Sequence, residues 1–166
     1  MIAKLHYGPI KSWETFLNIK LILLSMLKEL IGNKIFLAVI IAGLSVQIIK
    51  ILIYFAENKK LAWKDIVVTG GMPSSHSAFV TSLATIIYLM EGITTSLVIS
   101  LVLAAIVIRD AFGVRRSVGE EGLMLSKIAK NLKLHKKLHY AMGHTPAQVL
   151  VGGVLGVVIA YLVYLW

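Results

Sequence analysis

The sequence of 166 residues contains no cysteine, only three prolines, and eight acidic residues against seventeen lysines and arginines. Without cysteine the chain can form neither a disulfide nor a thiolate metal site. Charged residues make up only 15% of the chain, whereas the hydrophobic fraction of 58% exceeds ordinary soluble usage. Because the hydrophobic residues occur in long blocks, we expect one integral membrane domain over residues 1–166.

The formal net charge of +9 is expected to set membrane topology and to attract anionic lipid. No nucleic-acid-binding motif accompanies this charge, so we expect no nucleic-acid partner. We also expect no cofactor and no metal ion. His135 and His139, four residues apart on a helix face, could form a metal pair, but no third ligand is evident.

Four apolar segments predict an all-α fold, a polytopic bundle of about four transmembrane helices. The first, 35–56, is apolar except for Gln47 and Lys50, and Lys50 lies near enough to one end to snorkel. Proline favours the first helical turn, so a helix is expected to begin at Pro73. The other expected spans are 73–90, 94–112 and 146–166.

Two further segments carry apolar residues at helical spacing among charges, which is typical of amphipathic helices at a membrane interface. They are 12–31 and part of 113–143. In the last span, small residues would allow close approach to a neighbouring helix, either within the chain or in a homo-oligomer. These are Gly152, Gly153 and Gly156.

Four spans place the connections 57–75 and 109–146 on the same side of the membrane, so His76 and His144 can meet there. That side carries twelve lysines and arginines against five on the other, which favours a cytoplasmic site. Several of the twelve would belong to the site itself and are poor topology markers.

Two short motifs each place a histidine beside the start of an apolar run. They are Gly70-Gly71-Met72-Pro73-Ser74-Ser75-His76 and Gly143-His144-Thr145-Pro146. A helix start attracts anions because its N–H groups are unpaired and its dipole end is positive. Two such starts with nearby Lys and Arg predict a phosphate site at a membrane surface.

Phosphoryl transfer needs positive charge, an in-line nucleophile and a proton for the leaving oxygen. One histidine could attack phosphorus and the other could protonate the leaving group, while Asp110 could orient the nucleophilic imidazole. Hydrogen bonds and positive charge for the phosphate could come from serines, arginines and a lysine of 59–64. The candidates for binding the substrate are Ser74, Ser75, Arg115, Arg116, Lys60, Lys64 and Gln148.

Pro73-Ser74-Ser75-His76 resembles the Pro-Ser-Gly-His motif of the type 2 phosphatidic acid phosphatase and vanadium haloperoxidase superfamily. Together with two later motifs, it is similar to the divergent branch of small bacterial, archaeal and plant membrane proteins. The later motifs are Asp110-Ala111-Phe112-Gly113-Val114-Arg115-Arg116 and Gly143-His144-Thr145-Pro146-Ala147-Gln148. The resemblance covers about Trp63 to Gly156.

The resemblance implies a helical bundle in a bacterial or archaeal cell membrane. It also implies metal-independent hydrolysis of a lipid phosphate or pyrophosphate, with His144 as the nucleophile that becomes phosphohistidine and His76 as the general acid. The sequence departs from the family pattern at four places. The first motif lacks its Arg-Pro pair, and Ser75, Leu138 and Gln148 replace the expected glycine, arginine and aspartate.

Two other functions stay open at this point. The altered third motif could leave a protein that binds a phospholipid headgroup without hydrolysing it. Alternatively, the glycines could form an oligomer seam in a structural or transport subunit.

Overall fold

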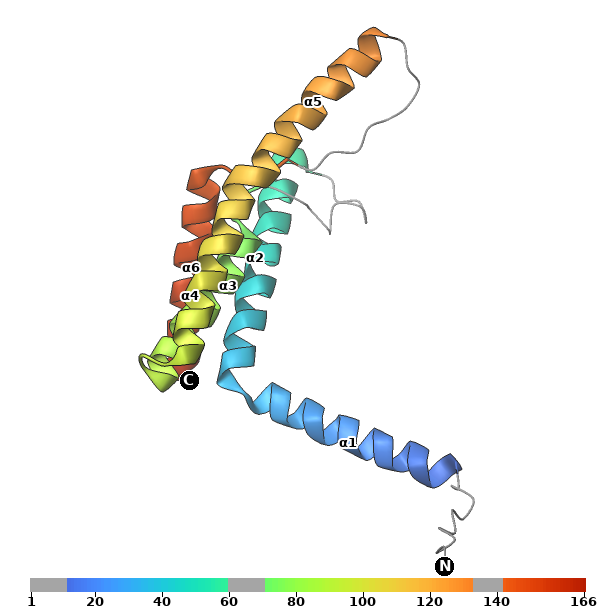
Figure 1. The fold of residues 1–166 in the computed structure, drawn as a ribbon, viewed down its shortest axis with the longest axis vertical. Coiled ribbons are helices and arrows are strands. Elements are labelled where there is room, and N and C mark those ends of the chain that lie inside the picture. The colour runs from blue at the N-terminus through green and yellow to red at the C-terminus, as the bar shows by residue number, and fades with distance from the viewer. Residues whose placement is uncertain (1–11, 60–70, 133–141) are drawn as a thin grey trace, which may run out of the picture.

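A computed structural model describes residues 12–59, 71–132 and 142–166, and these residues form helices joined by short connections (Figure 1). The described part of the chain contains no strand, which confirms the expected all-α membrane bundle. In chain order the elements are α1 (Ser12–Gly32), α2 (Lys34–Asn58), α3 (Ser75–Glu91), α4 (Thr95–Arg109), the π-helical segment η2 (Asp110–Val114), α5 (Arg115–Asn131) and α6 (Pro146–Leu165).

Helices α2, α3, α4 and α6 form the bundle, with α3 packed against the other three (Figure 1). The core cluster comes from α2, α3 and α6 and consists of Ala38, Ile86, Ala160 and Val163. Two alanines in this cluster let the helix backbones approach closely. Most large hydrophobic side chains instead lie exposed on the outside of the helices, as expected where lipid is the surrounding solvent.

Three helical stretches are long and apolar enough to cross a membrane: α2, the continuous stretch Thr95–Asn131, and α6. Helix α3 has 17 residues, at the lower end of the range for a span. The predicted apolar segments are therefore all present as helices, in the predicted order.

The second apolar helix begins two residues later than the sequence predicted. Ser74 is the N-cap residue, and its hydroxyl oxygen accepts the backbone N–H of Ser77 at 3.4 Å. Helix α3 therefore begins at Ser75, and the prediction that it begins at Pro73 was wrong. The corresponding prediction for Pro146 is confirmed, since this proline opens α6.

The two predicted amphipathic segments extend from opposite ends of the bundle (Figure 1). Helix α1 leaves the start of α2 at a steep angle, and its hydrophobic side chains, including Phe16, Leu21 and Met26, are exposed. Helix α5 continues the line of α4 beyond the bundle instead of forming a separate element. Residues 133–141, with His135 and His139, lie outside the described residues.

Glycines on α6 bring this helix against α3. Close approach within the chain was one of the two alternatives predicted for these glycines. A Cβ atom added at Gly152 would overlap the carbonyl oxygen of Ser74, and one at Gly156 would overlap the hydroxyl of Thr81. The close approach expected from these glycines therefore occurs within the chain.

Candidate functional site

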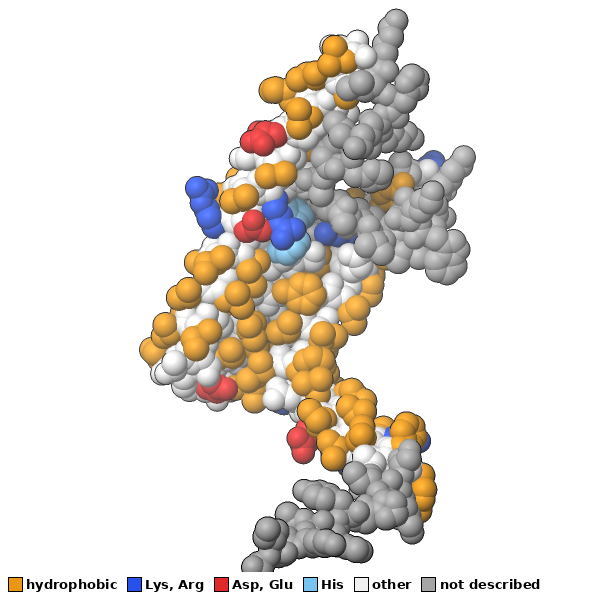
Figure 2. Space-filling model, turned by 45° about the vertical axis from the view of Figure 1, so that its right-hand side comes forward, with side chains coloured by type: hydrophobic (Ala, Val, Ile, Leu, Met, Phe, Trp, Pro, Cys, Tyr) orange, Lys and Arg blue, Asp and Glu red, His pale blue; other side chains and the backbone are white. Residues whose placement is uncertain are grey.

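The imidazoles of His76 and His144 meet at one end of the bundle. Their ring centroids are 5.9 Å apart and their planes are inclined by 60°. In Figure 2 the pale-blue histidines lie beside blue and red charged side chains, and hydrophobic side chains cover the visible face of the bundle below them. The predicted meeting of the two rings is thus confirmed.

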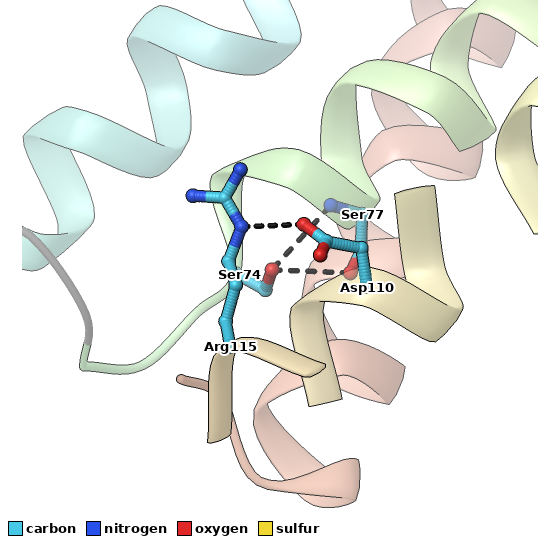
Figure 3. Close-up of polar contacts among 4 residues, drawn as sticks. All are labelled: Ser74, Ser77, Asp110 and Arg115. Carbon is cyan, nitrogen blue, oxygen red and sulfur yellow. Dashed lines mark hydrogen bonds and ion pairs between the residues drawn. The ribbon is translucent and has the colours of Figure 1, made fainter. Parts of the chain in front are cut away.

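Backbone contacts bring the starts of α3 and α6 together. The backbone N–H of Ser74 donates to the carbonyl oxygen of Gln148 at 3.1 Å. The buried hydroxyl of Ser74 accepts hydrogen bonds from the N–H and the hydroxyl of Ser77 (Figure 3). Ser74, predicted to bind substrate, therefore uses its hydroxyl to cap α3, while Ser75 opens the helix beside His76. Two helix N-termini converge, which favours an anion between them.

The π-helical segment η2 supplies the third side of the site. The backbone N–H of His144 donates to the carbonyl oxygen of Ala111 in η2 at 2.9 Å. Gly143 lies against the backbone of Arg115 and Arg116, where any Cβ atom would overlap main-chain atoms. Short π-helical turns are rare and occur frequently at functional sites. Here the π-helical turn contains Ala111, whose carbonyl oxygen holds the backbone of His144 in place.

Gln148 determines which nitrogen of His144 carries the proton. Its side-chain oxygen Oε1 accepts the backbone N–H of Thr145 at 2.9 Å, in a capping box at the start of α6. The same oxygen lies 3.4 Å from Nδ1 of His144. Because a carbonyl oxygen only accepts hydrogen bonds, this contact favours the tautomer with the proton on Nδ1, in which Nε2 carries the lone pair.

Burial lowers the pKa of His144 below its ordinary value of 6.5, since the ring is only 3% exposed. The positive charge of Lys50 lowers this pKa further, and the neighbouring His76 acts in the same direction. Hydrogen bonds to the side chain of Gln148 and to the backbone of Gly71 oppose them and raise this pKa. The balance keeps His144 neutral at neutral pH, which is the form that can act as a nucleophile.

His76 has a buried nitrogen without a partner. Its Nδ1 atom makes no hydrogen bond to any residue that the structure describes. Buried polar atoms in native proteins are nearly always paired, and each exception calls for an explanation. A catalytic role of the ring is one such explanation.

Asp110 pairs with Arg115 (Figure 3). The ion pair joins Nε of Arg115 to Oδ2 of Asp110, and the two terminal guanidinium nitrogens point away from that carboxylate. The sequence assigned the orientation of His144 to Asp110, whereas the hydrogen bond in the structure runs from His144 to Gln148. The charges of Asp110 and Arg115 both act on His76.

The other two arginines make contacts along their own helices. Arg116 bonds to Glu120 one turn further on, at 3.0 Å, and both side chains are exposed. Arg109 lies over the ring of Phe112, 5.6 Å from its centroid. Lys60 and Lys64, the predicted phosphate-binding lysines, lie outside the described residues.

Lys50 of α2 is the site residue that sequence reasoning missed. It was expected to snorkel towards water, but it is only 4% exposed, and its charge acts on both His76 and His144. The signal that could have found it is a single lysine within an apolar span, because charges inside a membrane are costly and usually functional. Lys50 therefore joins the cationic side of the site.

Comparison with known proteins identifies a matching family and a related membrane protein. A family model described as "Divergent PAP2 family" matches residues 31–159. The chain is also 36% identical to "Uncharacterized membrane protein YuiD" of Bacillus subtilis (strain 168), in an alignment covering 79% of this chain and 94% of that protein. No solved structure matches the chain. The family match spans both histidine motifs and Lys50.

Proposed function

This chain belongs to the divergent PAP2 family, and from that premise we propose that it is a metal-independent membrane phosphatase acting on a lipid phosphate or pyrophosphate. The observation that carries the proposal is the pair of imidazoles with centroids 5.9 Å apart. Rings this close can both reach one phosphoryl group, so that one nitrogen attacks phosphorus while the other ring meets the leaving oxygen. The two rings also differ in their hydrogen bonding, which suits different roles.

In the first step the lone pair on Nε2 of His144 attacks phosphorus, and an N–P bond forms as the bond from phosphorus to the leaving oxygen breaks. The leaving oxygen takes a proton from the imidazolium of His76, so the dephosphorylated lipid departs neutral at that oxygen. Gln148 holds the Nδ1 proton of His144 throughout this step. The dianionic substrate favours the protonated form of His76.

In the second step a water molecule attacks the phosphohistidine. Neutral His76 accepts a proton from this water, an O–P bond forms, and the N–P bond to His144 breaks. Inorganic phosphate leaves, and both histidines return to their starting protonation states.

Two cationic side chains would stabilise the negative charge on the phosphoryl oxygens. Lys50 contributes a buried ammonium from α2, and Arg115 offers its terminal nitrogens from α5. Backbone N–H groups at the starts of α3 and α6 add hydrogen bonds. Further candidates for substrate contacts are Lys60, Lys64, Arg116 and Ser75.

The experiment is an assay of phosphate release by the purified full-length protein in detergent, with a chelator present. Phosphatidate, phosphatidylglycerol phosphate and a polyprenyl pyrophosphate form the substrate panel. We expect turnover of at least one substrate, lost by roughly a hundredfold or more in His144→Ala and in His76→Ala, the range for removal of an acid–base group. Full activity of both folded variants would refute the assigned roles.

A headgroup-binding protein without turnover is the second candidate, and Gln148 favours it. A neutral amide orients the imidazole of His144 but cannot stabilise its positive charge as a carboxylate would. Vanadate or phosphate binding without hydrolysis of any substrate in the panel would support this second reading.

A further inference from the structure

An apolar groove runs from the histidine site down the side of the bundle. Its volume is about 530 Å³, within the range of ligand pockets. Ile108 and Phe112 line it from α4 and η2, Leu150 and Val154 from α6, and Thr81 from α3. The same three helical regions therefore supply the histidine site and this groove.

Two residues in the groove lining are close in sequence to residues that hold His144. Phe112 in its lining follows Ala111, whose carbonyl oxygen holds the backbone N–H of His144. Pro146, also in the lining, lies two residues after His144. One end of the groove therefore lies at the end of the bundle that carries the two histidines.

Among the lining residues that the structure describes, no side chain offers a free hydrogen-bond donor to a ligand. Thr81 has the only hydroxyl among the lining residues that the structure describes, and it donates within the protein, to the carbonyl oxygens of Ser77 at 2.8 Å and Gly153 at 3.0 Å. The α6 side chains Leu150 and Val154 are exposed. The groove is thus hydrophobic and opens towards the lipid that surrounds the bundle.

We infer that this groove holds the hydrocarbon chain of the phosphorylated lipid whose headgroup lies between His76 and His144. This inference rests on the proposed function and adds the substrate's route: the lipid enters sideways from the bilayer between α4 and α6, without leaving the membrane. A cationic site for phosphate next to an apolar groove of this size matches the two chemically different ends of such a lipid. Water-soluble phosphomonoesters lack the part of the ligand that the groove binds.

The test uses the full-length protein in phosphatidylcholine vesicles with a photoreactive lipid. The probe is a phosphonate analogue of phosphatidate, which cannot be hydrolysed, with a diazirine in the middle of one acyl chain. The comparison probe is diacylglycerol with the same chain. After irradiation, mass spectrometry maps the labelled residues.

We expect labels on the groove, at Val154, Val157 or Val158, with the phosphonate exceeding diacylglycerol roughly tenfold, as one charge-assisted contact would give. Val154→Trp should reduce this labelling several-fold, whereas Ile48→Trp, an exposed position of α2 outside the groove, should not. Equal labelling by both probes would mean that ordinary bilayer lipid fills the groove and would overturn the inference. Absence of groove labelling with either probe would overturn it as well.

A parallel assay separates this inference from the proposed function. Hydrolysis of phosphatidate without groove labelling would leave the phosphatase standing and remove the groove as its chain site. Phosphonate-dependent labelling without hydrolysis would keep the groove and remove the phosphatase. In an active protein, Val154→Trp should lower kcat/KM for dioleoyl phosphatidate more than for dihexanoyl phosphatidate.

Discussion

At the residue scale, the protonation of His144 depends on a neutral hydrogen-bond partner, the amide of Gln148. Gln148 favours the tautomer with the proton on Nδ1, while burial and Lys50 lower the pKa of His144 below 6.5. A histidine with a lowered pKa gains its neutral, nucleophilic form as pH rises through that value. The limb of the pH–rate profile that His144 sets should therefore lie on the acidic side of neutrality, with the rate falling as His144 becomes protonated.

Gln148→Glu should move the acidic limb of the kcat/KM profile to higher pH. A carboxylate accepts the same hydrogen bond from Nδ1 but also stabilises the imidazolium, so it raises the pKa of His144. The measurement is the pH dependence of kcat/KM for phosphatidate in detergent, which reports groups of the free enzyme. A limb that stays in place, or moves to lower pH, would contradict the assigned hydrogen bond.

Lys50→Met should weaken substrate use and change the titration of His144 together. Loss of one charge-assisted contact should lower kcat/KM by roughly tenfold to a hundredfold. Removal of the buried charge should also raise the pKa of His144, because Lys50 lowers it. Lys28→Met, on the exposed helix α1, is the control and should leave both unchanged. Normal kinetics in a folded Lys50→Met protein would remove Lys50 from the site.

Some of these residue roles could be predicted from the sequence and others could not. The two histidines were found because each precedes an apolar run at a helix start. Lys50 was missed because α2 is hydrophobic on all sides, so no periodicity shows which face turns inward. The pairing of Asp110 with Arg115, and of His144 with Gln148, depends on side-chain directions that spacing alone leaves open.

At the element scale, the packing of α6 on α3 holds the two histidines together. Gly152 faces the backbone at the start of α3, and Ser74 bonds across to Gln148. The sequence indicated the close approach from its glycines but not which helix would be the neighbour. It also gave no sign of the π-helical turn at 110–114, since single turns of this kind have no compositional pattern.

Gly152→Ala should destabilise the protein by about 1–3 kcal/mol, the usual cost of overpacking, because the added methyl group overlaps the Ser74 carbonyl. Gly153→Ala is the matched control, since its Cβ would meet only Thr81 Cγ2 at an ordinary 3.5 Å. Thermal unfolding of both variants in detergent, followed by circular dichroism, measures the difference. Equal Tm values for the two would show that α3 and α6 do not pack as described.

At the scale of the whole molecule, the histidine site lies at the end of the bundle from which α5 extends, and α1 leaves from the opposite end (Figure 1). Counting four spans was enough to place both histidine motifs on one side of the membrane. Which membrane face this is depends on charge counts, and these favour the cytoplasm.

The absence of cysteine allows a clean topology test with single cysteine substitutions. A membrane-impermeant maleimide applied to intact cells should label Ile93→Cys, in the exposed turn between α3 and α4. Glu57→Cys and Lys127→Cys should react only after permeabilisation, because the charge count predicts that the end of the bundle carrying the site faces the cytoplasm. Labelling of Glu57→Cys and Lys127→Cys from opposite faces would break the proposed arrangement.

The covalent intermediate tests the central claim most directly. Purified protein mixed with a phosphatidate labelled with ³²P and quenched within milliseconds should carry label that survives base, is lost in acid, and maps to His144. His76→Ala should retain some of this label and His144→Ala none. Turnover of the lipid without phosphate ever appearing on His144, or with equal label in the His144→Ala protein, would contradict the mechanism.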